Sequence, residues 1–177
     1  MKNKIVSAGV AAVIATGLTC MLVAQDKAAP QSSATILKAT YARIKTNFQK
    51  AAEKMPEENY SFKPADGVET FGQRVAHIAN QMGTCSAING QRKPSSAAGK
   101  TAKADLVAAL SESFAECDKT FDALTDANAM EAVSAGRGMQ PRINALYGIV
   151  VHANEVYGAM GVYMRVKGIV PPSSEGR

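Results

Sequence analysis

Two histidines are the first candidates for a chemical role in this sequence. His77 and His152 are the only histidines among the 177 residues, and each lies among apolar neighbours in a segment with helical periodicity. An imidazole can bind a divalent metal or carry a proton near neutral pH. A lone histidine in such a place is usually a hydrogen-bonded core residue, whereas two on different helices of one bundle favour a metal site. Both interpretations stay open on these residues alone.

Cys85 and Cys117 are the second candidate pair, and both fall on apolar stripes. In an exported protein two cysteines are more often bridged than free, with two buried thiols as the alternative. Each lies about 15 residues into its predicted helix, so an antiparallel hairpin would separate them by roughly 16 Å at helical rise. A bridge needs Cα atoms about 5.5 Å apart. A disulfide therefore predicts that these two helices run parallel, whereas free thiols leave their order open.

Four segments with helical periodicity position these residues. Apolar residues recur at spacings of three and four, and the segments are separated by stretches rich in proline and glycine. No strand-like alternation or internal repeat is present. The sequence therefore predicts an all-α four-helix bundle, with helices over residues 33–55, 70–89, 101–124 and 141–167.

The fourth segment is apolar over most of its circumference, which predicts the most enclosed helix of the bundle. Gly148, Gly158 and Gly161 each lower its helix propensity. We expect them to allow another part of the backbone to approach closely.

The first 24 residues have the pattern of a secretory signal. Lys2 and Lys4 give a basic start, residues 5–23 are almost wholly apolar, and small residues allow cleavage after Ala24. We therefore expect export to the periplasm or cell envelope, with no stable membrane span after cleavage.

Two alternatives to cleavage are lipid attachment at Cys20 and a retained membrane anchor, because about 19 apolar residues can span a bilayer. Under the cleaved interpretation the predicted layout is a signal peptide, a short lead, the bundle and a C-terminal tail, over residues 1–24, 25–32, 33–168 and 169–177.

The charge balance argues against a nucleic-acid partner. The net charge of the whole chain is +5. Lys2 and Lys4 lie in the predicted signal, which holds no acid, so the remainder carries 5 − 2 = +3. The basic residues are scattered, without a basic helix face and without interleaved aromatic side chains. We therefore predict no binding to nucleic acid.

Two blocks of sequence resemble the DinB/YfiT-like superfamily. Residues 55–64 followed by 71–79 are similar to its first two helices, and residues 152–158 followed by 163–173 to its last helix and tail. The resemblance implies an up-down-down-up bundle, in agreement with a Cys85–Cys117 bridge. It also implies that a homodimer is a reasonable expectation, since dimers are common among such relatives.

The family pattern further implies a divalent metal, zinc or nickel, held by three histidines. His77 matches the first, His152 the second, and the third would stand at position 156, where this chain has Val156. Valine has no lone pair, and two histidines alone hold such a metal weakly. Glu155 would supply an oxygen ligand if the helix were rotated, and is otherwise a solvated carboxylate. The candidate metal site is therefore His77, His152 and Glu155.

Three functions compete on these grounds. Some relatives implied by the resemblance are thiol-dependent S-transferases or hydrolases, in which a metal lowers the pKa of a thiol or of water. The missing third histidine favours instead an exported binding protein for a small-molecule ligand, with an incomplete metal site. A purely structural module is the third interpretation, and its signature would be a large exposed apolar patch.

Overall fold

The computed structural model describes residues 31–82, 84–135 and 138–176. These residues belong to one compact unit. The predicted signal, residues 1–24, and most of the predicted lead lie outside the described residues. No helix within the described ranges is long and apolar enough to cross a membrane.

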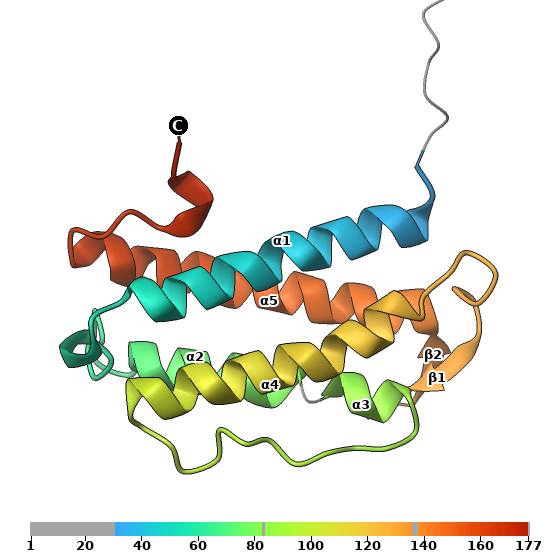
Figure 1. Cartoon of the computed structure of the whole chain (residues 1–177), viewed down its shortest axis with the longest axis horizontal. Coiled ribbons are helices and arrows are strands. Elements are labelled where there is room, and N and C mark those ends of the chain that lie inside the picture. The colour runs from blue at the N-terminus through green and yellow to red at the C-terminus, as the bar shows by residue number, and fades with distance from the viewer. Residues whose placement is uncertain (1–30, 83, 136–137, 177) are drawn as a thin grey trace, which may run out of the picture. The chain divides into compact units, whose positions relative to one another are not determined.

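The architecture is the predicted four-helix bundle. Helix α1 runs parallel to α5, α2 runs parallel to α4, and the two pairs point in opposite directions (Figure 1). Each helix packs against two others in the cyclic order α1–α4–α2–α5. The up-down-down-up order is confirmed. The helices of the bundle and its short third helix are α1 (Ser33–Lys54), α2 (Phe71–Met82), α3 (Thr84–Ile88), α4 (Lys103–Asp122) and α5 (Arg142–Val166).

Local signals in the sequence fix the helix ends. The hydroxyl of Ser32 accepts a hydrogen bond from the Thr35 amide at 3.2 Å at the start of α1. Before α2, Thr70 and Gln73 cap one another: the Thr70 hydroxyl accepts from the Gln73 amide, and the Gln73 side chain accepts from the Thr70 amide. This reciprocal pair satisfies two amides that the first helical turn leaves unpaired. Gly168, at φ 72°, ends the last helix in the left-handed region that favours glycine.

The helix expected over residues 70–89 is described as α2 up to Met82 and α3 from Thr84, with residue 83 outside the described residues. One feature differs from the sequence-based prediction. A small antiparallel hairpin, β1 (Ala132–Ser134) paired with β2 (Met139–Pro141), precedes α5. Its strands have three residues each, too few to produce a visible alternation of apolar and polar side chains. Two short 3-10 turns complete the described structure, η1 (Glu57–Asn59) and η2 (Pro172–Ser174).

The core lies between the four helices and is rich in aromatic rings. Tyr41 stacks on Phe121 with ring centroids 3.8 Å apart, and its hydroxyl donates to Asp118 at 2.8 Å. Burial, and then the bond to Asp118, raise the pKa of the Tyr41 phenol well above its ordinary value. The largest fully buried side chains are Phe48, Phe71, Phe114, Phe121, Met55, Ile78, Leu106, Leu110, Leu124, Leu146 and Met160.

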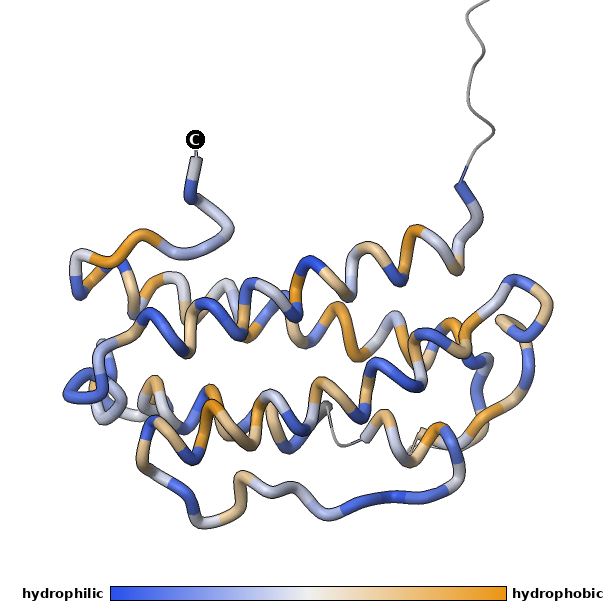
Figure 2. Tube along the Cα trace, viewed as in Figure 1, coloured by the Kyte–Doolittle hydropathy of each residue, from blue (hydrophilic) through white to orange (hydrophobic). Residues whose placement is uncertain are grey.

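A disulfide joins Cys85 of α3 to Cys117 of α4, with Cα atoms 5.0 Å apart. The chain returns between them along the bundle through residues 90–100, a largely hydrophilic crossover (Figure 2). Lys93 holds this crossover: its amide donates to the Ser86 hydroxyl, and its ammonium group pairs with Glu116 at 2.9 Å. The bridge and the parallel course of the two helices therefore agree with the argument from cysteine positions.

The prediction that α5 is the most enclosed helix is wrong for one side of it. Tyr147, Val151, Val162 and Val166 are exposed on its outer face. The prediction of close backbone approach also fails at two of the three glycines, because an added Cβ would meet nothing within 4 Å at Gly148 or Gly158. At Gly161 the neighbours are side chains rather than backbone, with the Arg165 guanidinium 3.3 Å and the ring of Pro171 3.7 Å from an added Cβ.

Candidate functional site: a histidine pair between α2 and α5

The two histidines meet across the α2–α5 interface. The Nε2 atoms of His77 and His152 are 2.9 Å apart, and the ring planes are inclined by 40°. The side chains are 38% and 37% exposed, so solvent reaches both rings. The two residues are 75 positions apart in sequence, and antiparallel packing of α2 against α5 brings them together.

The contact between the two rings constrains their protonation. A hydrogen bond between two Nε2 atoms needs one to carry the proton and the other to accept it. Two imidazolium rings would set two N–H groups against each other. At this separation, at least one ring of the pair therefore has an unprotonated Nε2.

A carboxylate lies beside each ring on its Nδ1 side. Glu69 Oε1 is 3.8 Å from Nδ1 of His77, and Glu155 Oε2 is 3.5 Å from Nδ1 of His152. Both carboxylates are therefore on the side of the ring away from the Nε2–Nε2 contact. The site is a row of four groups, carboxylate, imidazole, imidazole and carboxylate.

The sequence analysis missed Glu69, which is held in place by two other residues. Its second carboxylate oxygen pairs with the Arg74 guanidinium at 3.2 Å, and its backbone carbonyl accepts a hydrogen bond of 2.6 Å from the Tyr163 hydroxyl. Glu69 stands directly before the Thr70 cap and so lies just outside the helical periodicity. Its position two residues ahead of the helix that carries His77 was the signal that the sequence offered.

Glu155, the predicted third ligand, is 78% exposed. It follows His152 by three positions on the same helix, and its carboxylate approaches that histidine's Nδ1 rather than the space next to the two Nε2 atoms. At 3.5 Å the carboxylate is an electrostatic neighbour of Nδ1, on the side of the ring where carboxylates stand behind metal-binding histidines. In this arrangement Glu155 stands behind a ligand position and does not occupy one.

Val156 occupies the position that the family pattern gives to a third histidine. It is 3% exposed and belongs to the core. Within the described residues, no group of three histidine, cysteine, aspartate or glutamate side chains gathers to hold a metal ion. Two Nε2 ligands of a tetrahedral zinc would be about 3.3 Å apart at bond lengths of about 2.05 Å. The pair therefore comes close to supplying two ligand positions, but the donor set does not fit a complete three-residue centre.

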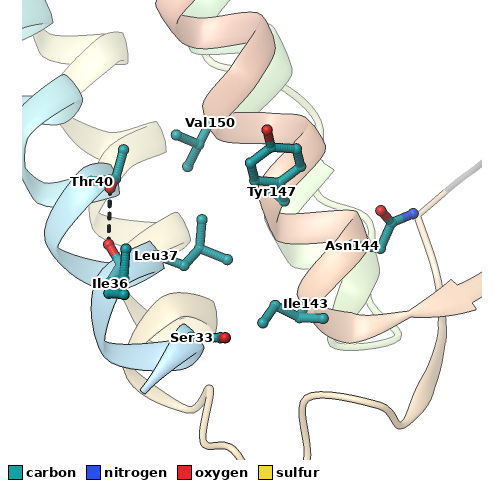
Figure 3. A pocket seen from close by; sticks show the side chains of 8 residues that line it. All are labelled: Ser33, Ile36, Leu37, Thr40, Ile143, Asn144, Tyr147 and Val150. Carbon is teal, nitrogen blue, oxygen red and sulfur yellow. Dashed lines mark hydrogen bonds between the residues drawn. The ribbon is translucent and has the colours of Figure 1, made fainter. Parts of the chain in front are cut away.

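A groove of about 370 Å³ opens on another side of α5, between the first turns of α1 and α5. In Figure 3 the lining side chains come from α1 and α5, and Leu37 and Val150 point into the open space between the two helices. None of the lining residues is a metal ligand or an acid. They are Ser33, Ile36, Leu37, Thr40, Ile143, Asn144, Tyr147 and Val150.

Comparison with known proteins places this geometry in a family. The family model of the DinB superfamily matches residues 40–157, more than half of the chain and including both histidines. No curated protein matches the chain.

Three solved structures are similar in fold. A DinB-like protein from Bacillus cereus superimposes with a TM-score of 0.65 at 18% identity, over 77% of this chain and 93% of its own. A DinB-like protein from Bacillus subtilis gives 0.60 at 19% identity, over 75% and 92%. A conserved protein from Enterococcus faecalis gives 0.58 at 16% identity, over 77% and 96%. At these identities the likeness shows the fold alone.

Proposed function

This chain belongs to the DinB superfamily, and on that premise we propose that it is an exported binding protein whose His77–His152 pair is the polar centre of an incomplete metal site. The observation that carries the proposal is the burial of Val156, 3% exposed, where the family pattern implies a third histidine. A residue without a lone pair, fixed in the core, cannot complete the site without repacking.

The position of the two carboxylates supports binding over catalysis. Glu69 and Glu155 both approach the Nδ1 atoms, so neither side chain is next to an atom held at the two Nε2 positions. A general base must lie within hydrogen-bond reach of the proton that it removes. The described arrangement instead leaves the space next to the two Nε2 atoms to water or to a bound small molecule.

Export is supported by the first 24 residues and by the disulfide. The basic, apolar and small-residue order of that segment is typical of a secretory signal, and a Cys85–Cys117 bridge is typical of proteins that mature outside the reducing cytosol. A location in the periplasm or cell envelope suits a small-molecule-binding role better than one that depends on an intracellular thiol cosubstrate.

A divalent-metal-dependent enzyme of the S-transferase or hydrolase type is the second candidate. The observation in its favour is the pair itself, because two Nε2 atoms 2.9 Å apart and reachable by solvent need to separate by only about 0.4 Å to bind one zinc or nickel ion. Glu155 would then have to swing from Nδ1 of His152 into the third position.

Metal content of the mature protein separates the two candidates. The protein is purified without chelators or a histidine tag, beside His77→Ala and His152→Ala variants, and zinc and nickel are measured by mass spectrometry. We expect far less than one equivalent in all three. About one equivalent in the parent and none in either variant would contradict the incomplete site, and loss of that metal in Glu155→Gln would identify the third ligand.

A further inference from the structure

The outer face of α5 is apolar and open to solvent. Tyr147, Val151 and Val162 follow one another along it and are 58%, 46% and 53% exposed. The single acid in the sequence of this helix is Glu155, and its contact with His152 places its carboxylate toward α2. The part of the face that turns toward α1 is therefore apolar and receives no acid from α5. Exposed apolar surfaces of this kind mark contacts with a partner or a membrane.

A row of basic side chains on α1 borders this face. Arg43, Lys50 and Lys54 are exposed, and their spacings of seven and four residues place them on one edge of the helix. That edge faces α5, because Thr40, one turn before Arg43, lines the groove between α1 and α5. At its other end Lys54 donates to the carbonyl of Val170, in the tail that follows α5. Basic residues that are scattered in the sequence thus lie side by side with the apolar face in the fold.

Two of these cations remain available to a partner. Lys54 pairs with Glu175 at 2.6 Å, whereas no ion pair joins Arg43 or Lys50 to another described residue. A basic side chain without an acid beside it leaves a positive potential at the surface, which attracts an anionic group.

The charges of the helices are divided between the two layers of the bundle. Helices α1 and α5 form one layer, and α2 and α4 form the other (Figure 1). The sequences of α1 and α5 hold seven basic and two acidic residues, 7 − 2 = +5. Those of α2 and α4 hold three basic and five acidic residues, 3 − 5 = −2. The apolar face belongs to the positive layer, so the electric field of the bundle turns this face toward an anionic surface.

We propose that the edge of α1 and the outer face of α5 dock on an anionic phospholipid membrane. The apolar side chains enter the boundary between headgroups and acyl chains, while Arg43 and Lys50 contact lipid phosphates. Tyr147 suits this depth, because its ring is apolar and its hydroxyl reaches water. The groove of about 370 Å³ beside Tyr147 opens between the same two helices and offers apolar space to the end of an acyl chain. An apolar strip bordered by cations suits a lipid leaflet better than a nucleic acid, whose binding surfaces are polar.

Co-sedimentation with sucrose-loaded vesicles tests the proposal. Mass spectrometry first confirms that the mature protein lacks residues 1–24, because an apolar leader would bind lipid by itself. We expect binding to equimolar phosphatidylglycerol–phosphatidylcholine vesicles and at least about tenfold weaker binding to phosphatidylcholine alone. Salt at about 0.5 M should weaken the binding. No binding at about 1 mM lipid would overturn the proposal and leave the face to a protein partner.

Two pairs of substitutions test which side of the bundle binds. Arg43→Ala with Lys50→Ala should weaken binding to the anionic vesicles about 25-fold, about fivefold for each charge. Arg92→Ala with Lys119→Ala removes the same two charges at exposed positions in the crossover and on α4, and should change the affinity less than about twofold. An equal loss in both pairs would overturn the proposed face, because binding would then depend on overall charge alone.

An environment-sensitive fluorophore on an added cysteine tests insertion. Emission from labelled Val162→Cys should shift to shorter wavelength when anionic vesicles are added. Emission from labelled Ser111→Cys, exposed on α4, should not shift, and equal shifts at both positions would overturn the assignment of the face. His77→Ala should bind vesicles as the parent does, so the result for the membrane face is distinguishable from the result for the metal site.

Discussion

The two sides of the α2–α3 segment are closed in different ways. Toward α4 it is joined by the Cys85–Cys117 bridge, and both cysteines are fully buried. Toward α5 it is joined by the His77–His152 contact, and both histidine side chains are more than one third exposed. One interface thus has a covalent bond and excludes solvent, while the other is polar and open. The difference separates an interface that is cross-linked and dry from one whose polar groups stay open to solvent.

The largest expected effect is on the closed side. Replacing both cysteines, Cys85→Ala with Cys117→Ala, removes a cross-link between residues 32 apart and should lower the free energy of unfolding by about 3 to 4 kcal/mol. Urea unfolding measures it, and the reduced parent should show a similar loss. An unchanged urea midpoint would mean that the bridge contributes nothing to stability.

The next effect is on the open side. Val156→His supplies the third imidazole and should raise zinc affinity about 100-fold or more, equivalent to at least about 2.7 kcal/mol. Isothermal titration calorimetry measures it, and the same change in a His77→Ala background is the control that removes a ligand. Equal affinity in parent and variant would show that position 156 does not face the pair.

A smaller effect on stability and on the His77 site is expected at Tyr163 of α5. Tyr163→Phe removes the bond to the Glu69 carbonyl and should cost about 1 kcal/mol, with a shift of the His77 imidazole signals in NMR. Tyr157→Phe is the matched control, because its hydroxyl accepts from the Ser173 amide in the tail. The same His77 shift in both variants would argue against a positioning role for Tyr163.

The smallest effect is at the crossover and depends on pH. Hydrogen bonds from Lys119 and then Lys93 lower the pKa of Glu116 below its ordinary value of 4.5. A lowered pKa means that the contacts are present above the ordinary value and are lost as the pH falls through the lowered one. Hydrogen-exchange protection of the Lys93 amide should therefore fall as the pH drops through the lowered pKa of Glu116, below 4.5. In Glu116→Gln this step should be absent, and a step that persists would point to another acid.

The sequence predicted the closed side better than the open side, for a physical reason. Cys85 and Cys117 lie at similar distances from the starts of their predicted helices, and these distances can be counted in the sequence. Helical rise then shows that a bridge between them requires the two helices to run parallel. The sequence also placed His77 and His152 in one candidate metal site, because they lie on different helices of the bundle and match the family pattern, and the structure brings them together. Glu69 was not predicted, because a residue ahead of a helix cap is positioned by the packing of Tyr163 and Arg74, which no periodicity encodes.

The outer face of α5 shows a second limit. Val151 and Val162 are apolar, and helical periodicity does not predict whether another part of the bundle covers such residues or leaves them exposed. The hairpin before α5 was missed because three-residue strands carry too little pattern.

The crossover and the disulfide together make the connectivity of the chain partly redundant. Arg92 and Lys93 lie in an exposed stretch between the two bridged cysteines. Cleavage by trypsin after Arg92 would divide the polypeptide, but the disulfide would keep the two pieces joined. On a gel the nicked protein would migrate as one species until a reductant is added, and as two afterwards. In a protease-rich compartment, the fold would therefore tolerate a cut that severs the connection between α3 and α4.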